Sequence, residues 1–502
     1  MYSTDPIADQ AHSILDWKGA RATRQFLEAQ LESVVNSSAE MLALLAEEAF
    51  ESGEDDRARH FLGRALTIDH ADPTALAVSA MVEGGKLRLA GTPGAAREFW
   101  ERALAVPRPS WLTFNNLPNY FARTGMEDRG IELGHRAVTE YADSPHCSMV
   151  MAHLWDTLMH CERSDRALRV AQERFPTHHE VLCTFAGRRT SQLKLSERMI
   201  TEASEQAPDH HQPKSSLAFN YLLQARGADA EALAKMALEI RPDDGLAMDV
   251  LKSVEQSRGN NAEALEWKRR LRELDPSSRR NFITDLCIDG VKSDPVETNR
   301  QLLEIEGRGG VEARTARFYR LLYFTAHSFV DTRKLLDEIE EDENRTRFWF
   351  VHKAEFVRDV RKPDEAIRVY REGLERFPQD GRLTAGLIAW LGLSQRESEL
   401  KTELEKLRTE PPGEPQGLME VARVLGQQRR FGLAKEMIRH GQSEFPGATR
   451  FGQVDLALDV VAGRVPTVYR TLKSTGQLSL KNAHLLLRAS LFAVRPPYGS
   501  RD

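Results

Sequence analysis

Proline recurs through the second half of this chain at a fixed interval of 34 residues. Six prolines share one phase of that interval: Pro208, Pro242, Pro276, Pro378, Pro412 and Pro446. The two skipped positions carry Gly310 and Asn344, which are also turn formers. Because proline disfavours helix in the residue before it, a regular series of prolines predicts a regular series of helix ends.

Small residues follow the same interval. The unit that ends at Pro242 carries Ala230, Ala234 and Ala237, and the unit that ends at Pro446 carries Ala434. Small side chains let two helices cross at short distance. Alternating β-branched runs, the usual signal of strands, are nearly absent. Each interval is therefore predicted to hold a pair of closely packed helices.

This period and these small residues resemble the tetratricopeptide repeat, whose unit is two helices and a turn. The resemblance covers about 177–448, roughly eight units. It implies an all-α fold, an α-solenoid in which antiparallel helical hairpins of about 34 residues stack into a right-handed superhelix with a concave face. Units 279–312 and 313–346 keep apolar residues but few small ones, so we expect them to be degenerate members.

We expect four segments along the chain. Residues 1–38 are predicted to form N-terminal helices that cap the stack, and 39–176 to form irregular repeats of the same kind. Residues 177–448 form the regular array, and 449–502 C-terminal capping helices and a tail. The upstream stretches "ARHFLGRAL" and "AREFWERAL" also resemble the half-a-tetratricopeptide repeats of RNA-processing scaffolds.

Composition limits the class of protein. The net charge of −6 argues against a nucleic-acid coat, and no apolar run is long enough to predict a bilayer-spanning helix. The N-terminus lacks the pattern of a secretory signal. The four cysteines form no CxxC motif and no disulfide framework, which favours a reducing cytoplasm. The excess of arginine over lysine is typical of a GC-rich, bacterial genome.

Motifs of catalysis are missing from the sequence. It contains no GxxxxGK[ST], GxGxxG after a strand, HExxH or GxSxG, so we predict neither an enzyme nor a cofactor. His153 and His160, with Cys161 beside them, share one helix face, but a metal would need further ligands at fixed geometry. We predict no metal site and interpret the histidines of 135–211 as loop and solvated residues.

Two further stretches stand out by composition. The acidic run "EIEEDEN" at 338–344 is interpreted as a solvated turn, with an interaction epitope as the alternative. Aromatic residues gather at 317–324 and 347–356. Tyr323 and Phe350 fall on packing positions of the repeat, so we expect both in the core.

The resemblance also places side chains in the groove, because in this family the first helix of each unit lines the concave face. Its inward positions fall mainly on arginines, including Arg188 and Arg189. We predict a partner-binding set: Arg280, Arg314, Arg317, Phe348, Arg358 and Arg382. Arginine binds carboxylates and phosphates bidentately. The alternative is pairing within the chain, for example with Glu355 or Asp359. The paired Lys and Asn of the carboxylate clamp are not found.

The function predicted from this pattern is a non-enzymatic scaffold or adaptor that holds a peptide or protein, possibly acidic, in its groove. One alternative is an accessory subunit of an enzyme, secretion or glycan-building assembly, which co-purification would reveal. Another is an RNA-associated scaffold, which would need stacking aromatics between cations. A standalone enzyme has no segment left for a catalytic domain.

Overall fold

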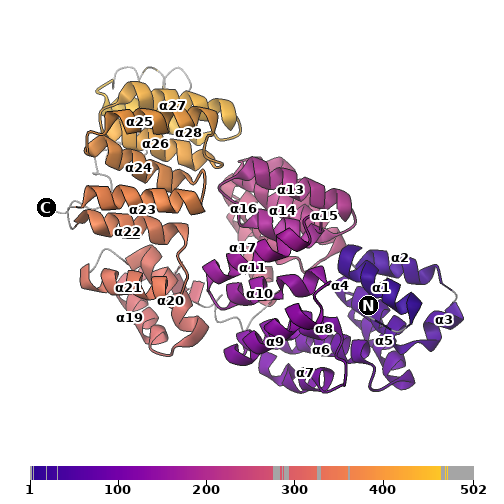
Figure 1. Cartoon of the computed structure of the whole chain (residues 1–502). Helices are drawn as coiled ribbons and strands as arrows, with labels where there is room; N and C mark the ends of the chain where they lie inside the picture. Colours follow the sequence, from indigo (N-terminus) through magenta and orange to yellow (C-terminus); the bar gives the residue numbers. More distant parts are fainter. Residues whose placement is uncertain are drawn as a thin grey trace.

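The protein is built from helices. The computed structural model describes residues 3–472 apart from 4, 19, 31, 275–282, 285, 288–292, 325–328, 360, 361, 465–467, 469 and 471. Within those residues every regular element is helical, with 27 α-helices, one short 3-10 helix and no strand (Figure 1). The predicted all-α class is confirmed.

The helices form a series of hairpins, each with a first and a second helix. The first helices are α4 (Ala39–Glu51), α6 (Pro73–Leu89), α8 (Trp111–Arg123), α10 (Pro145–Thr157), α12 (His179–Gly187), α14 (His211–Leu223), α16 (Gly245–Arg258), α20 (Gly310–Phe324), α22 (Arg347–Asp359), α24 (Gly381–Leu393), α26 (Pro415–Gln427) and α28 (Arg450–Val461). The second helices are α5 (Asp55–Ile68), α7 (Arg97–Leu104), α9 (Glu127–Glu140), α11 (Cys161–Arg174), α13 (Leu193–Gln206), α15 (Gly227–Ile240), α17 (Asn261–Leu274), α19 (Pro295–Glu306), α21 (Phe329–Glu341), α23 (Pro363–Arg376), α25 (Glu397–Thr409) and α27 (Phe431–Glu444). Three helices, α1 (Pro6–Lys18), α2 (Ala20–Glu28) and α3 (Glu32–Ser37), precede them, and η1 (Pro93–Ala96) precedes α7.

The second helices end where the prolines predict. Helices α13, α15, α23 and α27 each end two residues before a proline of the 34-residue series. Pro276 lies outside the described residues. The turns inside several hairpins use a residue with left-handed backbone, as at Ala225 (φ 62°), Gln395 (φ 56°) and Arg429 (φ 60°). Such a residue stops the preceding helix and lets the chain reverse.

The stack curves with the first helices on the inside. Each first helix packs on the first helix of the next unit, as in the pairs α4–α6, α8–α10, α14–α16 and α24–α26. The second helices pack mainly on the first helices beside them, as in α15–α16 and α23–α24. A row of helices that touch directly is shorter than a row that does not, so the first helices line the concave side.

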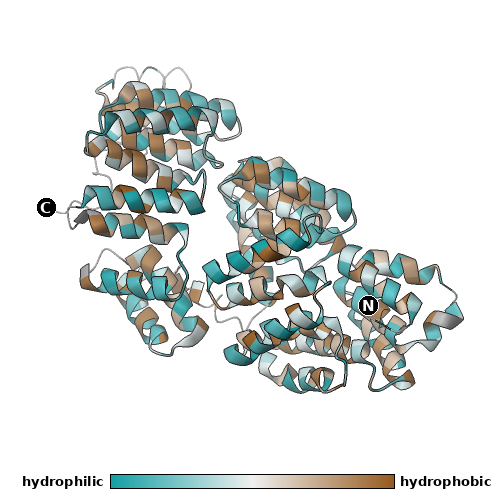
Figure 2. Ribbon diagram, viewed as in Figure 1, coloured by the Kyte–Doolittle hydropathy of each residue, from teal (hydrophilic) through white to brown (hydrophobic). Residues whose placement is uncertain are grey.

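Small residues occupy the predicted crossings between helices. Ala218, Ala230, Ala234 and Ala237 are fully buried in one cluster, and bands of apolar residues run along the contacts between helices (Figure 2). The solenoid core is thus a continuous layer between the two rows of helices.

One of the two aromatic core predictions is wrong. Phe350 is buried, with 1% of its surface exposed, as expected. Tyr323 is 41% exposed. Its ring stacks on Tyr319, one turn earlier on the same helix, with a centroid distance of 6.3 Å.

The superhelix closes until consecutive turns touch. Arg241 binds Glu51, Arg314 binds Glu127, and the His160 ring contacts the Asp342 carbonyl, across separations of 190, 187 and 182 residues. One superhelical turn therefore spans between five and six units of 34 residues. In Figure 1, α10 and α11 accordingly lie beside α20 and α21. None of the helices in the described ranges combines the length and apolarity needed to cross a bilayer.

Candidate functional site

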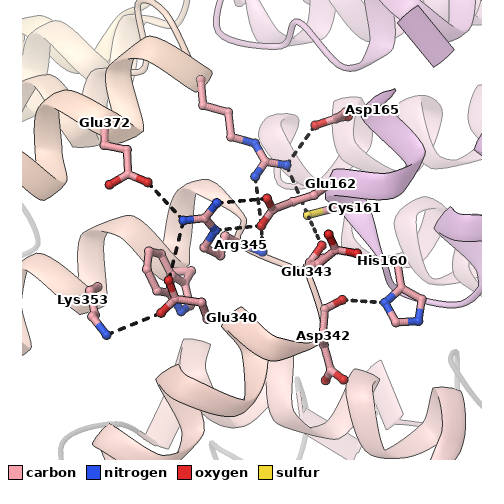
Figure 3. A network of polar contacts seen from close by, with 12 residues as sticks. His160, Cys161, Glu162, Asp165, Glu340, Asp342, Glu343, Arg345, Lys353 and Glu372 are labelled. Carbon is pink, nitrogen blue, oxygen red and sulfur yellow. Dashed lines mark hydrogen bonds and ion pairs between the residues drawn. The ribbon is translucent and has the colours of Figure 1, made fainter. Parts of the chain in front are cut away.

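The start of α11 meets the loop between α21 and α22 in a buried polar contact (Figure 3). Glu162 lies at its centre. Arg345 donates from Nε and Nη2 to the two carboxylate oxygens of Glu162 at 2.8 and 3.1 Å, and Arg376 approaches to 3.2 Å. Burial alone would raise the pKa of Glu162, but the hydrogen bond from Arg345 and the charge of Arg376 outweigh it, so that pKa is lowered.

The acidic run at 338–344 belongs to this contact, so its interpretation as a solvated turn is wrong. The carbonyl of Asp342 lies 2.5 Å from Nδ1 of His160, and the carboxylate of Glu343 binds Arg163 and Arg166. The backbone N–H of Glu162 also donates to the Glu343 carbonyl at 3.0 Å. The run is an interaction epitope, and its partner is the preceding turn of the same chain.

A pocket of about 320 Å³ opens beside this contact. One wall comes from α11, the end of α12 and the loop after it. The other comes from α20, the start of α22 and the end of α23 with the loop that follows. The pocket is therefore assembled from two turns of the superhelix, and neither turn alone forms it.

Positive charge exceeds negative charge in the wall of this inter-turn pocket, which holds five arginines and two aspartates. Three of the arginines are neutralised within the chain: Arg188 by Asp156, Arg347 by Asp380 and Glu414, and Arg376 by Glu162 and Asp165. The other two, Arg169 and Arg189, have no salt bridge to any residue that the structure describes. The pocket thus carries two uncompensated guanidinium groups.

Two polar atoms at the pocket are buried without a hydrogen-bond partner among the described residues, Nε of Arg189 and Oγ1 of Thr346. Arg189 also stacks over Phe185 at 4.4 Å and donates from Nη1 to Gln192 at 2.8 Å. Burial and the charge of Arg169 lower the pKa of Arg189. Since buried polar groups in native proteins are normally paired, an unmet donor in a positive field fits an anionic ligand.

Two of the predicted binding residues lie at this pocket. Phe348 forms part of its wall, and Arg382 lies over the Phe348 ring at 5.4 Å. Arg347 lies 5.1 Å from the same ring. Arg188 and Arg189, which the repeat pattern also placed inward, line the pocket with them.

Arg314 and Arg317 are engaged within the chain. Arg314 donates to the Leu158 carbonyl at 2.6 Å and to Glu127 at 2.8 Å, and Arg317 pairs with Asp342 at 3.0 Å. Both pairs join the two turns. The alternative of intramolecular pairing therefore describes these two arginines, although with carboxylates other than the two considered. Arg280 lies outside the described residues, and Arg358 is described only as part of α22.

Sequence reasoning missed Arg169, Arg347 and Arg376. Arg169 is on α11 and Arg376 on α23, both second helices, which the repeat pattern assigns to the outer row. They reach the pocket because the next turn of the superhelix packs against that row. A signal for them would require the pitch of the superhelix, which a single unit does not encode.

The histidines between 146 and 211 form a buried row, so their interpretation as loop and solvated residues is wrong. His178 and His179 are each 1% exposed. Adjacent rings lie 4.6 to 5.3 Å apart along the sequence His146, His178, His179 and His210. These residues fall at the starts of successive first helices, which the solenoid places side by side. The described residues include no group of three or more candidate metal ligands.

The N-terminal helix α1 packs on this histidine row. Asp16 lies 2.5 Å from Nδ1 of His146, and Trp17 makes an edge contact with His178 at 5.5 Å. Burial lowers the pKa of His178 to about 4 and that of His179 to about 3. Both rings are therefore neutral at pH 7.

The structure defines a helical-repeat solenoid whose turns enclose a basic pocket. Residues 312–421, which include most of the degenerate unit 313–346, match a family model described as Tetratricopeptide repeat. The chain is a tetratricopeptide repeat protein.

Comparison with other proteins adds similarity at the level of the whole chain. A crystal structure of the APC/C hetero-tetramer Cut9–Hcn1 matches with a TM-score of 0.45 and 13% identity over 90% of this chain and 89% of that one. A structure of Naa15/Naa10 bound to HypK-THB matches with a TM-score of 0.27 and 13% identity over 97% and 82%. No curated protein matches the sequence.

Proposed function

We propose that this protein is a non-catalytic scaffold that holds an acidic segment of a protein partner at the inter-turn pocket. One observation carries the proposal: Arg169 and Arg189 lie in one pocket wall without a carboxylate partner among the described residues. Guanidinium groups bind carboxylates with paired, charge-assisted hydrogen bonds. A rigid solenoid also loses little conformational entropy when it binds.

The predicted residues have different parts in this proposal. Phe348 supplies an apolar wall and Arg382 the rim beside it. Arg314 and Arg317 position the site by holding the two turns together. Arg280 and Arg358 are candidates to extend the basic surface, on their place in the repeat alone.

The cysteines support a cytoplasmic location as part of the same proposal. All four are free, and Cys147, Cys183 and Cys287 are buried. Burial raises the pKa of Cys161 to about 12, so that thiol is protonated at neutral pH. Free thiols persist in a reducing compartment.

Affinity purification from the native host tests the role. The tagged full chain is compared with the Arg169→Ala/Arg189→Ala variant and with a control, Arg269→Ala/Arg300→Ala. The control removes the same charge from arginines that are 57% and 59% exposed and pair within their own helices. Mass spectrometry should find an acidic partner that the pocket variant loses and the control retains. The same partners in all three samples would contradict the proposal.

The same experiment separates the alternatives. A retained partner set made of enzyme or secretion subunits would make the protein an accessory subunit of that assembly. Partners that disappear after nuclease treatment would indicate an RNA-associated scaffold. The thermal stability of the pocket variant should stay close to that of the parent, because the arginines it removes form no salt bridge with the described residues.

A further inference from the structure

The inter-turn pocket has an aromatic half that both turns build. Phe185 comes from α12, whereas Phe318 and Phe348 come from α20 and α22 and Phe377 follows α23. All four rings are partly buried. Phe318 and Phe348 meet edge to face with centroids 6.2 Å apart. Aromatic rings favour a further ring in offset or edge-on contact, so this half suits an aromatic side chain.

The polar half faces the same space. One face of the Arg189 guanidinium is covered by Phe185, its Nε–H is buried without an acceptor among the described residues, and so is the hydroxyl of Thr346. Arg169, on the exposed side of α11, adds a second positive charge. An acceptor that bears negative charge would satisfy the Nε–H and reduce the repulsion between the two arginines.

Size and charge narrow the ligand further. A volume of about 320 Å³ is at the low end for small-molecule sites, so the pocket accommodates one or two side chains. Asp165 and Asp380 also line it. Because like charges repel, these aspartates favour a singly charged carboxylate over a doubly charged phosphate.

We propose that the inter-turn pocket binds a peptide in which an aromatic side chain adjoins a carboxylate, and that this peptide holds the two turns together. The proposal rests on the proposed scaffold function and specifies its ligand. The ring lies among the phenylalanines, and the carboxylate accepts hydrogen bonds from Arg189 and the hydroxyl of Thr346.

The coupling to the turns follows from how the pocket is assembled. Its walls belong to α11–α12 on one side and α20–α24 on the other. A ligand that contacts both walls binds the closed arrangement better than an open one, and it shifts the population toward the closed arrangement by that difference in affinity. The backbone hydrogen bonds between the turns, Glu162 N–H to the Glu343 carbonyl and Gly413 N–H to the Ser191 carbonyl, report on that population.

Saturation-transfer NMR with the full chain tests the ligand. The probes are an acetylated and amidated Gly-Glu-Phe-Gly peptide, its analogues with Gln for Glu and with Ala for Phe, and an acetylated Gly-Gly-Gly-Phe with a free carboxyl end. The phenyl protons of the first peptide should receive the strongest saturation. Loss of the carboxylate, of the ring, or of Arg169 and Arg189 should weaken binding about tenfold, whereas the Arg269→Ala/Arg300→Ala control should bind like the parent.

The fourth peptide identifies the source of the carboxylate, because it offers only a terminal one. Its binding in place of the first would assign the pocket to chain ends. Equal binding of all the peptides, or binding that ignores the two arginines, would overturn the proposal.

Hydrogen exchange tests the effect on the turns. Saturating peptide should slow exchange at the amides of Glu162 and Gly413 and leave that of Ala234 unchanged, since Ala234 lies in a different cluster. Binding without added protection would refute the coupling. If the peptides show no preference while partner capture still depends on the arginines, the ligand assignment fails and the scaffold role stands. If the peptides bind as expected but no partner depends on the arginines, the scaffold role fails instead.

Discussion

The Glu162→Gln variant is expected to loosen the contact between the turns while the repeats on either side stay folded. Glutamine keeps the volume of the side chain but removes the charge that binds both Arg345 and Arg376. Arg345 retains Glu372 at 3.1 Å, and Arg376 retains Asp165 at 3.0 Å. Neither guanidinium is left without a partner, so the loss is confined to this one contact.

The cost follows from how far the pair is buried. Exposed ion pairs contribute about 0–1 kcal/mol, and breaking a fully buried pair costs about 3–5 kcal/mol. Glu162 is 11% exposed and Arg345 is 26% exposed, so an intermediate value of about 2 kcal/mol applies. That free energy corresponds to a roughly 30-fold larger population of the open arrangement.

Hydrogen exchange followed by mass spectrometry measures this population directly. The amides of Glu162 and Val311 donate across the turns, so both should exchange about 30-fold faster in the variant. Amides inside the hairpins should not change. The matched control is Glu397→Gln, which removes an exposed carboxylate that pairs with Arg430 between neighbouring units. Unchanged exchange at both reporter amides would refute the view that Glu162 holds the turns together.

Three further substitutions test packing and charge. A side chain at Gly413 would place its Cβ 2.3 Å from a backbone carbonyl of the α12–α13 loop, so Gly413→Ala should lower the free energy of unfolding by about 1–3 kcal/mol in urea titrations, whereas Gly432→Ala, with nothing within 4 Å, should not. Ala234→Leu should overpack a fully buried crossing and cost about 1–3 kcal/mol, whereas Met236→Leu, at a 45% exposed position, should be neutral; equal stability of the two would mean that the repeat register is wrong. A histidine titrates near 6.5 when unfolded but His179 near 3 when folded, so the unfolded chain binds protons preferentially and stability falls as pH drops below about 6.5; His179→Phe should flatten the decline in melting temperature between pH 7 and pH 5, and an unchanged slope would exclude this ring as its cause.

The sequence predicts what repeats locally. The proline series locates the ends of the second helices because a helix end depends on neighbouring residues. Buried alanines such as Ala234 are predictable for the same reason, since each unit packs on its neighbours in the same way. Tyr323 escapes the rule, because its degenerate unit lets the ring stack on Tyr319 at the surface.

The inter-turn pocket depends on what accumulates over many units. A small rotation per repeat sets the pitch, and the pitch decides that Glu162 meets Arg345 at a separation of 183 residues. No pattern within 34 residues contains that quantity. The groove positions therefore predicted Phe348 and Arg189 at the pocket but neither Arg169 nor the pairing of Arg314 with Glu127.

Contacts between turns make this solenoid sensitive to its own length. In an open solenoid a unit inserted or deleted changes only the extent of the array. Here an inserted unit between Glu162 and Arg345 would displace one partner by at least about 8–10 Å, the spacing of packed helices, while the ion pair between them spans 2.8 Å. Duplication or loss of a whole repeat in that interval would therefore abolish the contact, although every hairpin would still fold. The number of units between the two residues is as much a determinant of this structure as the identity of the residues themselves.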